Sequence, residues 1–185
     1  MTILATYPDT GGEVSEVTRD YQAIKDAMRK IGVHLERWPT KGIAEDADSE
    51  LVKAAYANEI TELNRQYGFQ SVDVVTLEPD NPQAAELRSK FLAEHTHSDF
   101  EVRFFVHGDG LFYLHVEDKV YAIMCEKGDL ISVPENTTHW FDMGASPDFK
   151  CIRFFVIPDG WVGEFTGNNI ASRHVSYEEY KAEYM

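Results

Sequence analysis

The fold of this chain is decided by the stretch HTHSDFEVRFFVHGDG, residues 95–110. Side chains alternate between the two faces of an extended strand, so His95 and His97 point the same way, roughly 6.6 Å apart along the backbone. Both imidazoles can then bind one ion from the same face of the strand. Glu101 shares their face if the strand runs straight, and it meets them from a neighbouring strand if residues 98–99 form a turn. Either geometry brings a carboxylate to the same ion.

A fourth candidate ligand lies downstream, in the segment PENTTHW at residues 134–140. Three imidazoles and one carboxylate suit a first-row ion such as iron, nickel, manganese or zinc better than calcium or magnesium. The sequence therefore predicts a metal centre with four ligands, His95, His97, Glu101 and His139.

Composition limits the function classes that fit the chain. Its 185 residues are enough for one domain with a single sizeable core, and 43% apolar content argues against disorder. The net charge of −15, from 17 basic and 32 acidic residues, argues against nucleic acid and anionic membranes as partners. No apolar run approaches membrane-spanning length, and residues 1–12 lack the pattern of a secretory signal. We therefore expect a cytoplasmic protein with free, buried thiols at Cys125 and Cys151.

Hydrophobic periodicity predicts helices mainly in the first half of the chain and strands in the second. Helices are expected over residues 18–31, 48–67 and 82–91, and a capping box at Ser176–Glu179 predicts a terminal helix. The expected strands are an edge strand at 1–8 and strands at 33–38, 71–78, 101–106, 111–116, 120–125, 130–133, 140–143 and 150–157. A tight turn is expected at residues 107–110. Short strands at this spacing predict a mainly β fold, an antiparallel β-barrel with several α-helices packed outside.

We expect one domain over residues 1–185. Its first part, residues 1–70, is predicted to be mostly helical. Residues 71–160 are predicted to form the barrel with the metal site, and residues 161–185 a loop and a short helix.

Two spaced motifs carry a family resemblance. The first is His-x-His-x3-Glu-x6-Gly, from His95 to Gly108. The second runs from Gly128 through Pro134-x-Asn136-x2-His139-x3-Met143. Together they resemble the two motifs of the cupin superfamily, which implies a jelly-roll barrel with a metal inside its mouth. Asn136 stands where that family usually has glycine, and Met143 where it often has asparagine. Neither departure removes a ligand, and asparagine is the next best residue to glycine in a left-handed turn.

The layout of the whole chain is similar to the acireductone dioxygenase family of the methionine salvage pathway. The runs that carry this resemblance are HTHSDFEVRFFVHGDGLFYLH, GDLISVPENTTHWFDMG and IRFF. It implies a dioxygenase that cleaves acireductone (1,2-dihydroxy-3-keto-5-methylthiopentene) with O2, with one Fe2+ or Ni2+ per chain. With iron, the expected products are formate and 2-keto-4-methylthiobutyrate. With nickel, they are methylthiopropionate, formate and carbon monoxide.

Further site residues follow from strand alternation and from position near the motifs. Arg103 shares the face of Glu101, and its fixed fork of donors suits an anionic enediolate substrate. Arg153 is the alternative candidate for orienting the substrate. Asp99 is a candidate base, or a partner of a ligating histidine. The methylthio tail needs an apolar slot, for which the candidates are Phe91, Phe141 and Trp161.

Two other functions are compatible with the same ligand set. One is a different small-molecule cupin enzyme, another dioxygenase or an isomerase. The other is a non-catalytic metal-binding cupin that serves as a sensor or a store. The expected partners are a small-molecule substrate and O2, with no nucleic acid and no membrane. We expect a monomer, because no apolar stripe remains after the core is assigned.

Overall fold

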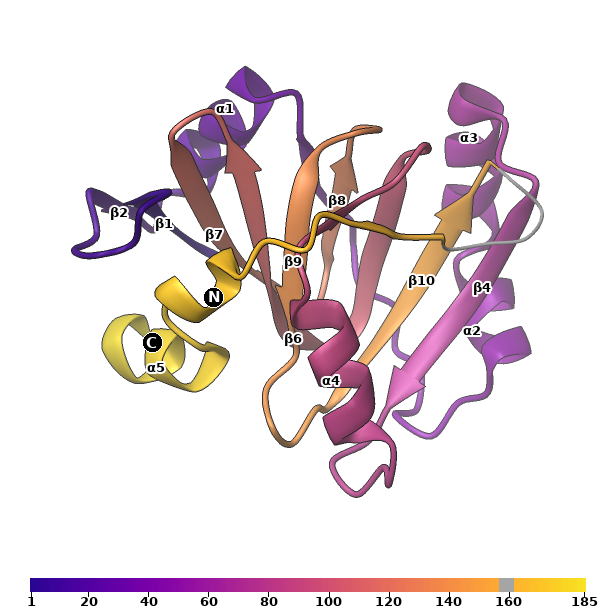
Figure 1. Ribbon diagram of the computed structural model, residues 1–185. Coiled ribbons are helices and arrows are strands. Elements are labelled where there is room, and N and C mark those ends of the chain that lie inside the picture. Colours follow the sequence, from indigo (N-terminus) through magenta and orange to yellow (C-terminus); the bar gives the residue numbers. More distant parts are fainter. Residues whose placement is uncertain (157–161) are drawn as a thin grey trace.

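A computed structural model describes residues 1–156 and 162–185 of the chain. Within them, eleven strands join in antiparallel pairs, and helices lie outside the sheets (Figure 1). This confirms the predicted antiparallel β fold with external helices. The strands are β1 Ile3–Pro8, β2 Glu16–Thr18, β3 His34–Arg37, β4 Ser71–Leu77, β5 His95–Thr96, β6 Glu101–Val116, β7 Lys119–Glu126, β8 Asp129–Val133, β9 Thr138–Asp142, β10 Phe149–Phe155 and β11 Glu164–Phe165.

Strand β6 belongs to both walls of the barrel. Its first half pairs with β8 and β10, and its second half pairs with β7 and β9. The predicted tight turn at residues 107–110 is therefore wrong, because β6 bends there without reversing. Phe105 pairs with Cys151 while His107 pairs with Lys150, so Val106 is an extra residue in a β-bulge. Gly108, with φ +69°, supplies the left-handed backbone next to it.

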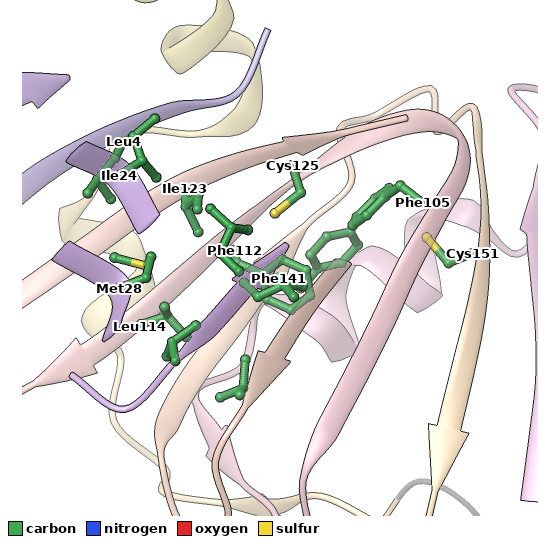
Figure 2. Packing of buried hydrophobic residues seen from close by; sticks show 14 of the residues in the cluster. Leu4, Ile24, Met28, Phe105, Phe112, Leu114, Ile123, Cys125, Phe141 and Cys151 are labelled. Carbon is green, nitrogen blue, oxygen red and sulfur yellow. The ribbon is translucent and has the colours of Figure 1, made fainter. Parts of the chain in front are cut away.

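The bulge changes which face the later side chains of β6 occupy. Phe105 lies in the interior cluster before the bulge, and Phe112 and Leu114 lie in it afterwards, so the parity shifts from odd to even. Figure 2 shows Phe105, Phe112 and Phe141 gathered between the strands. The Phe112 and Phe141 ring centroids are 4.8 Å apart. The bulge thus lets one strand fill the barrel from both walls.

Both thiols lie in this apolar interior. Cys125 and Cys151 are free and fully buried, as predicted. Burial raises the pKa of Cys151 to about 12 and also raises that of Cys125. Both therefore stay as unreactive thiols at neutral pH.

The helices cover the outside and one end of the barrel. They are α1 Tyr21–Lys30, α2 Ser49–Ala55, α3 Ala57–Tyr67, α4 Ala84–Leu92 and α5 Tyr177–Tyr184, with a 3-10 turn, η1, at Ile170–Arg173. Figure 1 shows α2 and α3 beside β4 and β10, and α5 at the opposite flank. No helix in the described ranges is both long and apolar enough to cross a membrane.

Three predicted elements differ from those observed. The single helix expected at 48–67 is two helices, because Tyr56 leaves helical geometry (φ −103°, ψ 19°) and buries its ring 4.9 Å from that of Phe104. Helix α4 begins at Ala84, since Asn81 accepts a hydrogen bond from Gln83 N and forms a turn before the helix. The part expected to be mostly helical also adds β1, β2 and β3 to the barrel walls, and β1 lies between β2 and β7 as an inner strand.

The predicted capping box is present at the start of α5. The Ser176 hydroxyl accepts from Glu179 N, and Glu179 accepts from Ser176 N at 2.7 Å. We expect Ser176→Ala to lower the free energy of unfolding by about 1 kcal/mol, because a helix amide loses its acceptor. Urea denaturation measures this loss. Ser49→Ala is the control, since that serine also begins a helix while Asp48 serves as its cap. Equal losses in the two variants would show that the cap contributes nothing.

Candidate metal centre

The four predicted ligands come together inside the barrel mouth. His95 lies in β5, His97 follows it, Glu101 begins β6 and His139 lies in β9. Residues 98–99 are a bend between strands, so Glu101 reaches the histidines from β6, the next strand along the chain, which pairs with β9 but not with β5. His95 and His139 face each other directly in the register of β5 and β9. All four side chains are buried, and their potential ligand atoms lie within 4.8 Å of one another.

Backbone carbonyls set the orientation of all three imidazole rings. The Nδ1 atom lies 2.6 Å from Ala93 O in His95, 2.8 Å from Val162 O in His97 and 2.8 Å from Thr137 O in His139. A carbonyl only accepts, so each contact assigns the proton to Nδ1. Each Nε2 then keeps its lone pair for an ion, and in two of the rings it points at Glu101.

Glu101 is the charged centre of the cluster. Its Oε2 lies 2.8 Å from His97 Nε2 and 3.2 Å from His139 Nε2. Arg103 Nε lies 2.7 Å from the other oxygen, Oε1. Burial opposes ionisation, but the nearby positive charge of Arg103 is the largest effect in the other direction, and the pKa of Glu101 is held well below its usual range. The carboxylate is therefore ionised, which is the form that binds a metal.

The histidines differ in their ease of protonation. Burial, followed by the nearby His139, lowers the pKa of His95 to about 4. Burial also disfavours the charged form of His97, but Glu101 outweighs this effect and raises the pKa of His97. His95 is consequently neutral at neutral pH and ready to act as a ligand.

The donor set fits a first-row divalent ion. Three imidazole nitrogens and one ionised carboxylate are typical ligands of such ions. The Nε2 lone pairs of His97 and His139 face the ionised Oε2 of Glu101 at 2.8 and 3.2 Å, an arrangement that is unfavourable without a cation between these atoms. An ion bound by these atoms would fit this side of the carboxylate, because Arg103 already pairs with the other oxygen, Oε1.

Aromatic rings surround the guanidinium of Arg103. Its central carbon lies 4.7 Å from the centroid of Phe141, 5.2 Å from Phe112 and 5.9 Å from Phe91. These distances are within the range of cation–π attraction. The structure thus brings Phe91 and Phe141, the expected apolar slot, next to the predicted substrate-orienting arginine. Strand alternation alone misses Phe112, because the bulge in β6 turns it inward.

The other predicted site residues make different contacts or lie outside the described residues. Arg153 faces Arg103 in the register of β10 and β6, but its guanidinium binds Asp73 at 2.7 and 2.9 Å. Asp99 accepts hydrogen bonds from the backbone amides of Phe100 and Val156, so its carboxylate links the bend at residues 98–99 to the end of β10. Trp161 lies outside the described residues. The carbonyl of Val162 is a site contact that no sequence pattern indicated.

Comparisons with known proteins agree with this site. Residues 12–163 match the model of the ARD/ARD' family. An acireductone dioxygenase of Methylococcus capsulatus is 51% identical over 185 residues, covering 100% of both chains, and one of Aquifex aeolicus is 52% identical over 180 residues, covering 97% of this chain and 98% of its own. A solved acireductone dioxygenase from Bacillus anthracis, with cadmium in its active centre, superposes with a TM-score of 0.77 at 30% identity. It covers 89% of this chain and 98% of its own.

Full-length identity of about one half, a matching barrel and a buried His-His-Glu-His cluster lead to one conclusion: the chain belongs to the acireductone dioxygenase family.

Proposed function

We propose that the chain is a metal-dependent dioxygenase that cleaves acireductone with O2, and that His95, His97, Glu101 and His139 hold one Fe2+ or Ni2+. The observation that carries this proposal is the buried cluster of three imidazoles and one ionised carboxylate, in a chain that matches acireductone dioxygenases along its whole length. When bound, the ion would act as a Lewis acid to which two neighbouring substrate oxygens can coordinate.

The chain's own residues supply charge, orientation and exclusion of water. Arg103 provides a permanent positive charge beside Glu101, and its planar fork suits the oxygens of an enediolate. Phe91, Phe112 and Phe141 hold that guanidinium in place and keep water from its faces. Polar contacts are stronger where water is excluded. A substrate that such contacts hold in one orientation reacts only at the carbons that this orientation exposes.

Product analysis tests this proposal directly. Apo-protein is reloaded separately with Fe2+ and Ni2+ and given synthetic acireductone under O2. We expect formate and 2-keto-4-methylthiobutyrate from the iron form, and methylthiopropionate, formate and carbon monoxide from the nickel form. If both forms bind metal tightly but neither consumes O2, the substrate assignment is wrong and the chain is a different metal-binding cupin.

Arg103→Ala should lower kcat/KM for acireductone by about 100-fold or more, in line with the loss of one positioned electrostatic contact. Metal content should stay at one ion per chain, because Arg103 is not a ligand in this scheme and a bound cation would itself keep Glu101 ionised. Elemental analysis and O2 uptake measure the two quantities. Arg153→Ala is the control, since Asp73 already holds that guanidinium. Loss of metal in Arg103→Ala would rule out a role confined to the substrate.

We further propose that residues 1–185 act as one monomeric domain in the cytoplasm. Strands from the whole described chain share the barrel. The exposed large apolar side chains of the described residues are few, as on ordinary monomers: Met1, Leu51, Val162, Phe165 and Met185. Sedimentation velocity would test this, and a dimer at micromolar concentration would contradict it.

A further inference from the structure

A buried carboxylate lies directly behind the candidate ligand His95. Glu94 precedes it in the chain, and only 3% of Glu94 is exposed. Because neighbouring side chains point to opposite sides of an extended backbone, Glu94 lies outside the cluster that His95 enters. Burial of a carboxylate is unfavourable unless partners compensate it. The partners of Glu94 are therefore informative about its role.

Three segments of the chain meet at Glu94. Its Oε1 lies 2.8 Å from Nδ1 of His115, near the end of β6. Its Oε2 accepts from the Thr166 hydroxyl at 2.6 Å, and its backbone oxygen accepts from Thr166 N at 3.0 Å. Thr166 directly follows β11. Glu94 thus ties the start of β5 to one wall of the barrel and to the C-terminal segment.

The backbone that Glu94 holds is the one that orients His95. The His95 imidazole donates from Nδ1 to Ala93 O at 2.6 Å, so the positions of Ala93 and His95 relative to each other set the direction of Nε2. Strand β5 is only two residues long: it pairs with β9 through His95 and His139 alone, and with the equally short β11 through two residue pairs. So short a ladder constrains the backbone weakly. The side-chain contacts of Glu94 add the constraint that the ladder lacks.

We propose that Glu94 is a positioning residue of the metal centre, which, together with His115 and Thr166, holds His95 in the direction needed for metal binding. It acts through His95 and touches neither metal nor substrate. The inference rests on the proposed ligand set, to which it adds a support on the far side of β5. Partners that orient a metal ligand commonly change metal affinity about 10- to 100-fold when they are removed.

The experiment measures Ni2+ affinity by competition with a chelator, and the nickel environment by X-ray absorption, in holo-protein whose folding is checked by circular dichroism. We expect Glu94→Ala to weaken Ni2+ binding about 10- to 100-fold and to reduce the imidazole scattering around nickel. Glu94→Gln keeps one acceptor oxygen and should lose less. Thr166→Val, which removes one hydroxyl at nearly constant volume, should give a smaller loss that is not additive with Glu94→Gln.

Asp129→Asn is the matched control. Asp129 is a second fully buried carboxylate, held by Thr2 at 2.5 Å and Arg37 at 3.0 Å, and it contacts none of the four candidate ligands. If burial alone matters, both carboxylate variants lose thermal stability and keep wild-type nickel affinity and spectra, and the proposal fails. If Glu94→Ala does not fold, the spectra and affinities of Glu94→Gln and Thr166→Val decide the question in the same way.

The wild-type spectrum separates this inference from the function on which it rests. Absence of imidazole scattering around nickel in the wild-type protein would show that the proposed ligand set is wrong. Imidazole scattering that is present in the wild type and unchanged in both Glu94 variants would refute the positioning role alone.

Discussion

His139→Ala should lose more than about 100-fold in affinity for Fe2+ or Ni2+ and, with it, O2 uptake in the presence of acireductone. Removing a mere partner of a ligand already costs about 10- to 100-fold, and His139 is proposed to be a ligand itself. Its ring is buried beside those of His95 and His97, with ring centroids 4.5 and 4.9 Å away. No other described histidine lies in the cluster to replace it.

The measurements are metal content after dialysis and O2 uptake, with circular dichroism as a check on the fold. His34→Ala is the matched control, because its side chain is half exposed, pairs only loosely with Glu36 and lies outside the cluster. It should keep one ion per chain. A His139→Ala protein that retains stoichiometric metal and turnover would remove this residue from the ligand set and leave a three-ligand site.

Gly108→Ala should strongly destabilise the fold. A Cβ atom at this position would lie 1.8 Å from the carbonyl oxygen of Asp148 and 2.8 Å from the Phe149 Cα. Both are backbone atoms, one in the loop before β10 and one at the start of β10, so neither can rotate away as a side chain can. The residue must also keep φ +69°, which itself costs about 1–2 kcal/mol for a residue with a side chain. We expect a total loss above about 4 kcal/mol, or failure to fold.

Gly68→Ala separates the two causes. Gly68 has φ +70° at the end of α3, and an added Cβ would meet nothing within 4 Å. It should therefore show the conformational cost alone, about 1–2 kcal/mol in urea denaturation. Equal losses at the two glycines would mean that the loop before β10 yields easily and that close packing at the bulge is unimportant.

The bulge at Gly108 connects the stability of the fold with the site. It turns Phe112 inward, against the guanidinium of Arg103 and the ring of Phe141. Arg103 in turn lies beside Glu101. The glycine that the first motif contains therefore has a defined physical role: it lets one strand contribute Glu101 and Arg103 before the bend and the ring that packs against Arg103 after it.

Local patterns were sufficient for much of this protein. Alternation placed His95 and His97 on one face and Arg103 on the face of Glu101. The spacing from Gly128 to His139 pointed to the fourth member of the cluster, and Ser176 with Glu179 predicted the start of α5. His139 was tied to the cluster by the motif resemblance, whereas the other features depend on residues a few positions apart, which backbone geometry alone relates.

Other features depended on the tertiary structure. Alternation left two routes by which Glu101 reaches the histidines, and the bend at residues 98–99 places Glu101 on a separate strand, β6, which does not pair with β5. The expected turn at 107–110 became a bulge, because pairing with β10 on one side and β7 on the other keeps β6 extended. The long helix expected at 48–67 was broken, because the ring of Tyr56 packs against Phe104.

The contacts that orient the three imidazoles show this division most clearly. Ala93 and Thr137 each lie two residues before the histidine that they orient, yet no particular residue type is required for a backbone carbonyl to accept a hydrogen bond. Val162 reaches His97 across 65 positions, and Thr166 reaches Glu94 across 72. The sequence by itself determined which donors are present and which face each strand offers. Only the folded chain decided which backbone groups and distant side chains contact these donors, because such contacts depend on the register of strands far apart in the sequence.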